Sequence, residues 1–258
     1  MKAALIQHET ELGDKSTNIQ RCLEGLHDAG QNGARLAVLP ELSTTGYGLG
    51  EGHLEMAEPI PGPTTDRFGE VAAEYGMYVV AGMAETGPVR GQCYNSAVLI
   101  DDTGDVVGTY RKTHLALYVH TSKALVEEKE IFTPGEELPV FETDVGTIGL
   151  LICQDGNYPE AFRELALKGA DYVVIVYNSP TEEMLTLRSR VAAYVNGMYV
   201  LLSNKTGSET GRYVGDRRDH GEQEVEYTGR SHVVDPHGEI VGKLPRDETG
   251  ILVETVDL

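Results

Sequence analysis

The sequence contains no long hydrophobic run. No window of its 258 residues approaches the roughly 20 consecutive apolar residues that a membrane-spanning helix needs. The amino-terminal stretch MKAALIQHE turns polar after Ile6, which is too short for the hydrophobic region of a signal peptide and is typical of a first β-strand. We therefore expect a protein of the cytoplasm that has no membrane partner.

Cysteine is scarce, and the chain has only Cys22, Cys93 and Cys153. No two of them have the C-x-x-C spacing, which argues against a disulfide framework and against a zinc site. Reduced thiols in a reducing compartment are the expected state.

Positive charge is scarce as well. The chain has 21 lysine and arginine residues against 41 aspartate and glutamate residues, a formal net charge of −20. Such a surface repels nucleic acid and anionic membranes, because phosphate binding needs a basic patch. We therefore expect no nucleic-acid partner. The same composition fits an enzyme of a high-salt cytoplasm and an acidic enzyme of ordinary salt equally well.

The chain also lacks repeats, low-complexity segments and any linker rich in proline, glycine or serine, so we predict one domain over residues 1–258. Short apolar runs alternate with amphipathic stretches, which indicates a layered α/β fold with about four helices and ten to twelve strands. Many of the strands are apolar on both faces, as expected where a second layer covers them. Helices on one face of a sheet and a second sheet on the other would satisfy this pattern.

The predicted helices and strands follow from periodicity and turn residues. Asp14 or Ser16 is the expected cap of the first helix, and Gly30 and Gly33 are expected to end it. The expected helices cover 16–30, 64–76, 158–169 and 182–197. The expected strands cover 3–7, 35–41, 77–85, 95–101, 106–112, 145–153, 170–178, 198–204, a hairpin over 231–242, and 250–258.

Three chemically capable residues each end an apolar strand. Cys153 precedes a turn whose backbone N–H groups, such as that of Gln154, could form an oxyanion hole. Glu41 follows a proline and could act as a general base. Arg111 and Lys112 should point to opposite faces, so that one of them enters the cleft. Singly, each has an ordinary alternative: a packed thiol, an exposed loop acid and a solvated strand end. Together they are expected to meet at one rim of the sheet.

The segments that contain these residues resemble those of a known family. The segments LAVLPELSTTGY, GTYRKTHL and GLLICQDGNYPEAFRELALKGADYVV are similar, in order and spacing, to the three signature segments of the nitrilase superfamily, the carbon–nitrogen hydrolases. The resemblance covers nearly the whole chain and implies a four-layer αββα sandwich. It also implies that Glu41 is the general base, Lys112 the lysine that stabilises the transition state, and Cys153 the nucleophile.

The resemblance implies further residues and partners. A second family glutamate precedes a PG turn and matches Glu128, although the neighbouring acids at positions 127 and 130 are close. Gln154, Tyr47 and Asn178 are the expected substrate-binding residues. No metal or organic cofactor is implied. The expected partners are a small-molecule amide and further copies of the chain, in a homodimer or a higher homo-oligomer.

The run QDGNYPE after Cys153 resembles the motif of aliphatic amidases and formamidases. It favours hydrolysis of small linear amides to a carboxylic acid and ammonia, through a cysteine thioester. Those enzymes are usually longer, however, and the segment KTHLALYVHTSKALVEEKE is more similar to shorter general amidases. Nitrile, N-carbamoyl-amide and ω-amide substrates therefore stay open, and Arg188 and Arg190 are candidates for binding a dicarboxylate.

Two readings lie outside this mechanism. A cysteine–histidine hydrolase could use one of eight histidines, of which His114 follows Lys112 by two residues. A non-catalytic scaffold of the same fold would not need Glu41, Lys112 and Cys153, and the presence of all three argues against it.

Overall fold

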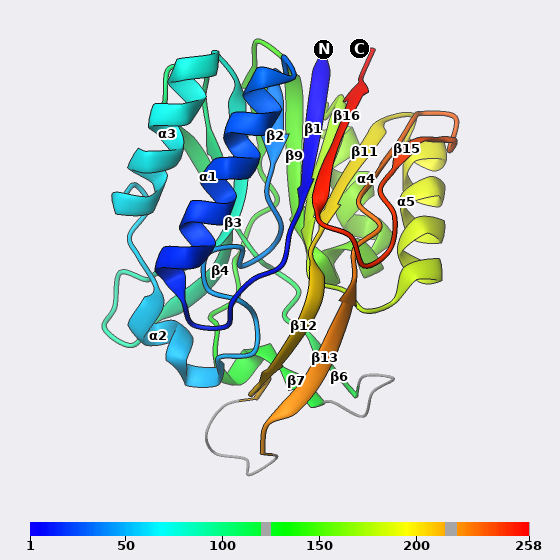
Figure 1. Cartoon of the computed structure of the whole chain (residues 1–258). Helices are drawn as coiled ribbons and strands as arrows, with labels where there is room; N and C mark the ends of the chain where they lie inside the picture. Colours follow the sequence, from blue (N-terminus) through cyan, green and yellow to red (C-terminus); the bar gives the residue numbers. More distant parts are fainter. Residues whose placement is uncertain (120–124, 215–220, 258) are drawn as a thin grey trace.

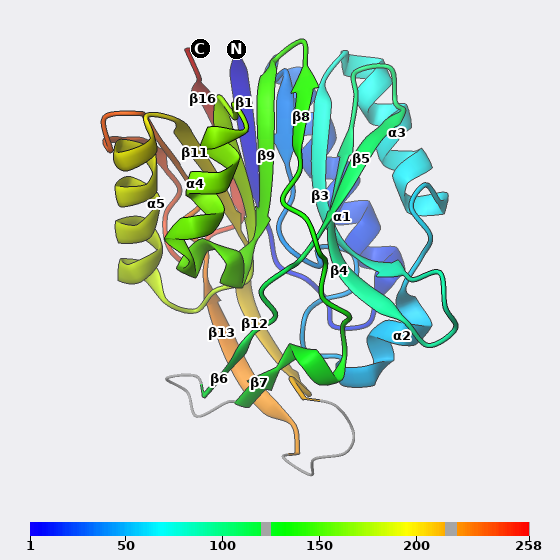
Figure 2. The ribbon, with the colours of Figure 1, turned by 180° about the vertical axis from the view of Figure 1, so that it is seen from behind.

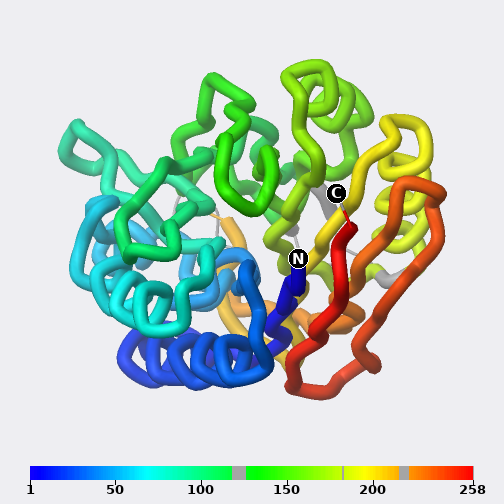
Figure 3. Tube along the Cα trace, turned by 90° about the horizontal axis from the view of Figure 1, so that it is seen from above, coloured from blue at the N-terminus to red at the C-terminus, as the bar shows by residue number. Residues whose placement is uncertain are grey.

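The chain folds into four layers. The structure, a computed structural model, describes residues 1–119, 125–214 and 221–257. Two six-stranded sheets pack face to face, and helices cover the outer face of each sheet (Figures 1 and 3). The αββα sandwich implied by the sequence is thereby confirmed. No helix in these three ranges is both long and apolar enough to cross a bilayer.

The first sheet has the strand order β16-β1-β2-β3-β4-β5. Helices α1 (Lys15–Gln31) and α3 (Pro63–Tyr75) cover its outer face (Figure 1). Because β1, β2 and β3 are parallel and β4 is antiparallel to both β3 and β5, strands β1, β2, β3 and β5 all end at the same edge. The strands are β1 (Lys2–Gln7), β2 (Leu36–Val38), β3 (Tyr78–Thr86), β4 (Cys93–Ile100), β5 (Val106–Arg111) and β16 (Gly250–Thr255).

The second sheet has the order β15-β14-β11-β10-β9-β8, with helices α4 (Pro159–Leu167) and α5 (Glu182–Asn196) outside it. Its central strands β9, β10 and β11 are parallel, as expected of strands joined by crossover helices. The strands are β8 (Val140–Thr143), β9 (Gly146–Ile152), β10 (Tyr172–Tyr177), β11 (Tyr199–Asn204), β14 (His232–Val234) and β15 (Ile240–Lys243).

The largest hydrophobic core fills the space between the two sheets and continues beneath α4 and α5. Every residue of β10 is buried, which explains why its sequence YVVIVY is apolar without alternation. Ser203 Oγ of β11 donates a hydrogen bond to the carbonyl of Ile6 in β1 at 2.8 Å and so joins the sheets directly. The two chain ends lie side by side on β1 and β16 (Figure 1).

The described part of the chain has sixteen strands and five α-helices, more than the sequence predicted. Two extra hairpins project beyond one end of the sandwich (Figure 2). They are β6 (Leu117–Val119) with β7 (Leu125–Glu127), and β12 (Thr206–Gly211) with β13 (Gln223–Thr228). Their short or polar sequences, such as TGSETG, have no apolar run to mark a strand. The remaining short elements are α2 (His53–Met56) and the 3₁₀ turns η1 (Gly50–Gly52), η2 (Glu128–Glu130) and η3 (Cys153–Asn157).

The start of α1 matches its prediction, and the end matches it at one of the two predicted glycines. Asp14 is the N-cap, and its carboxylate accepts a hydrogen bond from the N–H of Thr17 at 3.0 Å. Gly30, predicted to end the helix, lies inside it, whereas Gly33 directly follows the C-cap Asn32 with a φ of +76°, as expected of a glycine that ends a helix. A Cβ at Gly30 would lie 2.2 Å from the Tyr75 ring, so the glycine permits close contact of α1 with α3 rather than a helix end.

Candidate active site

Glu41 lies just beyond β2 and is fully buried. The strand stops before Pro40, and Leu42 has a positive φ of 45°, so the chain turns sharply around the glutamate. On β3, a Cβ at Gly82 would lie 2.5 Å from Glu41 Cα. The absence of a side chain at this glycine therefore lets β3 and the Glu41 backbone approach closely.

Lys112 follows β5 and is fully buried, whereas its neighbour Arg111 points outward to form an ion pair with Glu85. Their predicted opposite orientation is confirmed. Lys112 Nζ lies 2.8 Å from Oε1 of Glu41 and 2.8 Å from Oε1 of Glu128. Burial alone would lower the pKa of Lys112, but the two carboxylates outweigh it and raise that pKa well above its usual value.

Glu128, in η2, is the carboxylate that reaches the lysine. Its Oε1 contacts Lys112, and its Oε2 accepts a hydrogen bond from the N–H of Ala116 at 2.6 Å. Tyr47 donates its hydroxyl proton to Glu128 Oε1 at 2.8 Å. Of the three neighbouring glutamates in the sequence, the structure thus places the one at position 128 on Lys112.

Asn95, on β4, completes this carboxylate cluster and was not among the predicted site residues. Its Nδ2 donates to Glu41 Oε1 at 2.7 Å and lies 3.4 Å from Glu128 Oε1. In the sequence it is one of the polar residues near the start of the strand Cys93–Ile100, no motif marks it, and its burial is known only from the structure.

Cys153 is the first residue of η3, directly after β9. It is buried, and its φ of +45° is unusual for a residue with a side chain. Strained backbone of this kind concentrates at functional sites. Burial and the charge of Glu41 raise the pKa of the thiol, while Lys112 and a hydrogen bond from the N–H of Asn178 oppose the rise. The resting sulfur is therefore a thiol.

Asp155 joins the cysteine turn to the lysine segment and was also missed. Its Oδ2 accepts hydrogen bonds from the N–H of Ile152 at 3.0 Å and from the Tyr110 hydroxyl at 2.8 Å. Its Oδ1 accepts one from the N–H of His114 at 2.9 Å and lies 2.8 Å from the ring Nδ1 of that residue. Its place two residues after Cys153, within the signature segment around that cysteine, is the sequence signal that could have revealed it.

The three expected substrate-binding residues differ in their surroundings. Gln154 accepts a hydrogen bond from Asn157 through its side chain, and Tyr47 uses its hydroxyl on Glu128. Asn178 follows β10 and is 1% exposed, yet neither Nδ2 nor Oδ1 has a hydrogen-bond partner in the described part of the chain. Glu41 Oε2 is likewise buried without such a partner.

The cysteine–histidine alternative finds little support. Cys22 Sγ lies 3.8 Å from His8 Nε2, but burial lowers the pKa of His8 to about 4 and raises that of Cys22 to about 12, so neither group is charged near neutral pH. His114 pairs with Asp155 and stacks on Tyr158.

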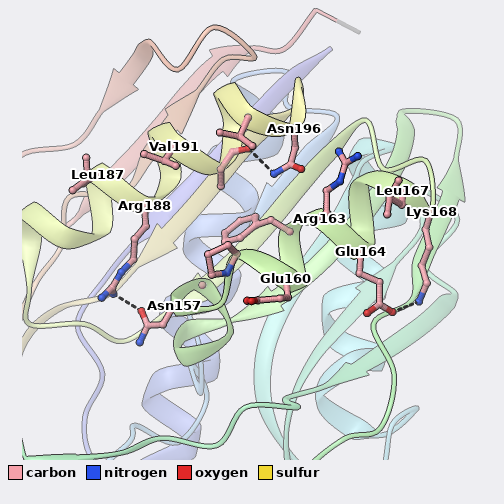
Figure 4. Close-up of a pocket in the computed structure, with 15 residues that line it drawn as sticks. Asn157, Glu160, Arg163, Glu164, Leu167, Lys168, Leu187, Arg188, Val191 and Asn196 are labelled. Carbon is pink, nitrogen blue, oxygen red and sulfur yellow. Dashed lines mark hydrogen bonds and ion pairs between the residues drawn. The ribbon is translucent and has the colours of Figure 1, made fainter.

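The two arginines considered for a dicarboxylate are engaged elsewhere. Arg188 donates to Asn157 Oδ1, and Arg190 donates to the carbonyl of Gly238 at 2.7 Å. Figure 4 shows the Arg188 contact on the outer face of the second sheet. Among residues 1–119, 125–214 and 221–257, no group of three or more His, Cys, Asp or Glu side chains is placed to hold a metal ion.

Comparison with known proteins agrees with this geometry. The sequence model of the carbon-nitrogen hydrolase family matches residues 2–258. The chain belongs to this family. A nitrilase of Pyrococcus abyssi is 32% identical over the whole chain and 90% of its own length. An omega-amidase of Xenopus tropicalis is 30% identical over 95% of the chain and 84% of its own length.

Solved structures of carbon–nitrogen hydrolases share the fold. An amidase of Nesterenkonia sp. AN1 superposes with a TM-score of 0.82 at 27% identity, covering 100% of this chain and 93% of its own. The Nit3 protein of Saccharomyces cerevisiae, at 23% identity, has the same fold with a TM-score of 0.82 over 98% of this chain and 89% of its own. The protein is thus a carbon–nitrogen hydrolase that acts on non-peptide bonds.

Proposed function

We propose that the protein is an amidase that hydrolyses small linear amides to a carboxylic acid and ammonia through a thioester on Cys153. The main support for this proposal comes from buried polar atoms that have no hydrogen-bond partner in the described part of the chain. They are Glu41 Oε2 and the side-chain amide of Asn178. Buried polar groups are almost always hydrogen-bonded. A primary amide offers an NH₂ donor to Glu41 and a carbonyl acceptor to the site, and so supplies the missing partners.

In the first step, Glu41 accepts the proton of the Cys153 thiol. Burial raises the pKa of Glu41 against the opposing charge of Lys112, which makes it a stronger base than an ordinary glutamate. The thiolate then attacks the amide carbon, and an S–C bond forms as the carbonyl oxygen gains negative charge. Lys112 and the N–H of Gln154 stabilise that oxygen.

In the second step, Glu41 gives its proton to the amide nitrogen, the C–N bond breaks, and ammonia leaves a thioester on Cys153. Water attacks the thioester carbon while Glu41 accepts one of its protons, and the acid product departs as the thiol is restored. The charges of Glu128 and, when it is ionised, Glu41 raise the pKa of Lys112 and so favour its positive charge. A structure of the Nesterenkonia amidase with acrylamide added to its active-site cysteine supports a cysteine nucleophile here.

The preference for amides over nitriles follows from the same unpaired atoms. A linear nitrile has no NH₂ group, so it would leave the acceptor Glu41 Oε2 buried without a donor. A site that hydrogen-bonds a substrate group can reject an analogue lacking that group by a factor of about 10⁴. The omega-amidase among the relatives supports an amide, whereas the Pyrococcus abyssi nitrilase makes nitrile hydrolysis the second candidate.

Ammonia release should be compared on propionamide, propionitrile, an aromatic amide and an N-carbamoyl amino acid. We expect a clear preference for propionamide in kcat/KM, no turnover by Cys153→Ala, and near wild-type turnover by the matched control Cys22→Ala. Equal or better kcat/KM on propionitrile would overturn the amide assignment, and substantial turnover by Cys153→Ala would overturn the thioester.

We also propose that the protein acts as a homodimer in the cytoplasm. Three reduced cysteines support that location. A groove of about 800 Å³ between α4 and α5 supports self-association (Figure 4). Leu187, Val191 and Val195 along α5 are all more than half exposed there. Arg163 and Glu160 give the groove both signs of charge, which a two-fold contact between identical patches can pair.

A further inference from the structure

A second buried ion pair lies near the proposed catalytic triad of Glu41, Lys112 and Cys153. Lys205, between β11 and β12, is fully buried and forms an ion pair with Glu209 of β12. Its Nζ also donates to Thr10 Oγ1 at 2.9 Å and lies 4.1 Å from the centre of the Tyr227 ring. Buried ion pairs contribute little net stability, because the loss of hydration offsets the attraction. Stability alone therefore does not account for this pair.

Glu209 holds the loop that carries Tyr47. Its Oε2 accepts hydrogen bonds from the N–H groups of Tyr47 at 3.0 Å and Gly48 at 3.2 Å, and its Oε1 accepts one from Thr10 Oγ1 at 2.6 Å. The loop approaches the carboxylate so closely that a Cβ at Gly46, which has a φ of +79°, would lie 2.7 Å from Glu209 Oε1. Glu209 thus fixes the backbone of this loop.

Tyr47 carries that restraint to the triad. Its hydroxyl donates to Glu128 Oε1, the same oxygen that accepts from Lys112, and both distances are 2.8 Å. Its carbonyl oxygen lies 3.1 Å from His53 Nε2, so the residue is held on both sides of its backbone. A displacement of about 1 Å in an active site can cost about 100-fold in rate. The position of Glu128 therefore depends on where Glu209 holds the loop.

We propose that Lys205 and Glu209 are positioning residues for the substrate-contacting carboxylate of Glu128 and act on it through Tyr47. This inference rests on the proposed function of the triad. In the described part of the chain neither residue forms a hydrogen bond or ion pair with Lys112 or Cys153, so their structural link to Glu128 runs through Tyr47, alongside the charge interaction of Lys205 with Glu41.

Burial and the opposite charge of its partner act in opposite directions on the pKa of each member of the pair. Burial lowers the pKa of Lys205, but the adjacent Glu209 opposes this. Burial would raise the pKa of Glu209, yet Lys205 and the hydrogen bonds hold it below its usual value. The other titratable groups whose charges act on the pair, or on which it acts, are Glu41, His8, His53, Tyr213 and Tyr227.

A double-mutant cycle on propionamide hydrolysis tests the proposal. Tyr47→Phe removes only the hydroxyl that contacts Glu128, and Glu209→Gln weakens the hold on the loop. Each should lower kcat by about 10- to 100-fold, the worth of one hydrogen bond to a charged group, with little change in KM. The double variant should lose no more kcat than Tyr47→Phe alone, because both changes interrupt the same series of contacts from Glu209 through Tyr47 to Glu128. Additive losses would overturn the proposal.

The pH dependence separates positioning from loss of fold. Burial and the charge of Glu128 raise the pKa of Glu41, so a displaced Glu128 should move the acid limb of kcat/KM to lower pH in both single variants. The charge of Glu128 raises the pKa of the Cys153 thiol, so alkylation of Cys153 by iodoacetamide should shift to lower pH in the same variants. Alkylation needs no turnover, so it tests the positioning role even if propionamide is not hydrolysed.

The control is Glu58→Gln, which breaks the 2.6 Å ion pair of Glu58 with Lys15, on a side chain whose other hydrogen bond is from the N–H of Thr64. It should leave both pH profiles unchanged. If Glu209→Gln does not fold, the paired change Lys205→Met with Glu209→Leu removes both charges at similar volume and serves in its place. Unshifted profiles in a folded variant of the pair would refute the positioning role.

Discussion

At the scale of single residues, the site concentrates charge where water is absent. Lys112 lies between Glu41 and Glu128, and all three are buried. Removing one member of such a group leaves another charge uncompensated, which is far more costly than losing an exposed ion pair. The roles of the neighbouring glutamates can therefore be separated by experiment.

Glu128→Gln should lower kcat/KM by about 100-fold or more, the usual worth of one preorganised polar contact in an active site. The reason is that Lys112 loses one of its two charged acceptors. Glu130→Gln, half-buried two residues away, should keep activity within about twofold and serves as the matched control. Steady-state kinetics with propionamide gives both numbers. Inactivation by Glu130→Gln with an active Glu128→Gln would mean that the wrong glutamate is assigned.

At the scale of elements, the site is made by the ends of strands in both sheets. Glu41 follows β2 and Lys112 follows β5 in one sheet, while Cys153 follows β9 and Asn178 follows β10 in the other. Within each sheet these strands run in the same direction, so their carboxyl ends share an edge. Close contact between neighbouring backbones then sets where each side chain lies.

Gly82→Ala tests this dependence. Its Cβ would lie 2.5 Å from Glu41 Cα and 2.5 Å from the carbonyl oxygen of Pro40, both backbone atoms that cannot rotate away. We expect a loss of about 1–3 kcal/mol in the free energy of unfolding and at least a tenfold drop in kcat. Gly52→Ala, where the nearest atom lies 3.6 Å away, should change neither quantity appreciably. Denaturant unfolding and propionamide kinetics measure both, and a fully active Gly82→Ala would contradict the expectation.

The elements that the sequence predicted are those with an apolar pattern. Strand β10 is apolar throughout, and α1 has a recognisable cap in Asp14. Hairpin β12–β13 was missed because most of its residues are polar, charged or glycine, as in a solvated loop. Lys205 and Glu209 were missed for the same reason. In the sequence a charged residue within a polar segment is expected to be exposed, and only the structure shows which residues it contacts.

The triad was predicted from motif order, and the residues that support it were not. Asn95 and Asp155 act through hydrogen bonds to segments tens of residues away, such as Glu41 and the N–H of His114. Only tertiary contact shows that such polar residues are buried. The choice of Glu128 among three close glutamates likewise rested on one motif position, and the structure adds its contacts with Lys112.

At the scale of the whole molecule, a strongly acidic protein leaves one apolar face uncovered. The net charge of −20 favours separate, well-solvated molecules. The α4–α5 face nevertheless exposes Leu167 at 71% and Val191 at 52% (Figure 4). Apolar side chains gathered on one face mark an interaction site more often than scattered ones do. A second copy of the chain carries the same patch, so a dimer covers both patches without any other protein.

Val191→Glu should therefore convert the proposed dimer to monomer. The new carboxylate would meet its own copy across the two-fold axis in an apolar contact, and two buried like charges repel strongly. Light scattering on the eluting peak of a sizing column gives the mass, which should fall by half, with salt held constant because screening weakens the effect. Val89→Glu, on an exposed turn away from this face, should leave the dimer intact. A wild-type monomer at micromolar concentration, or a dimer that survives Val191→Glu, would place the contact elsewhere or exclude it.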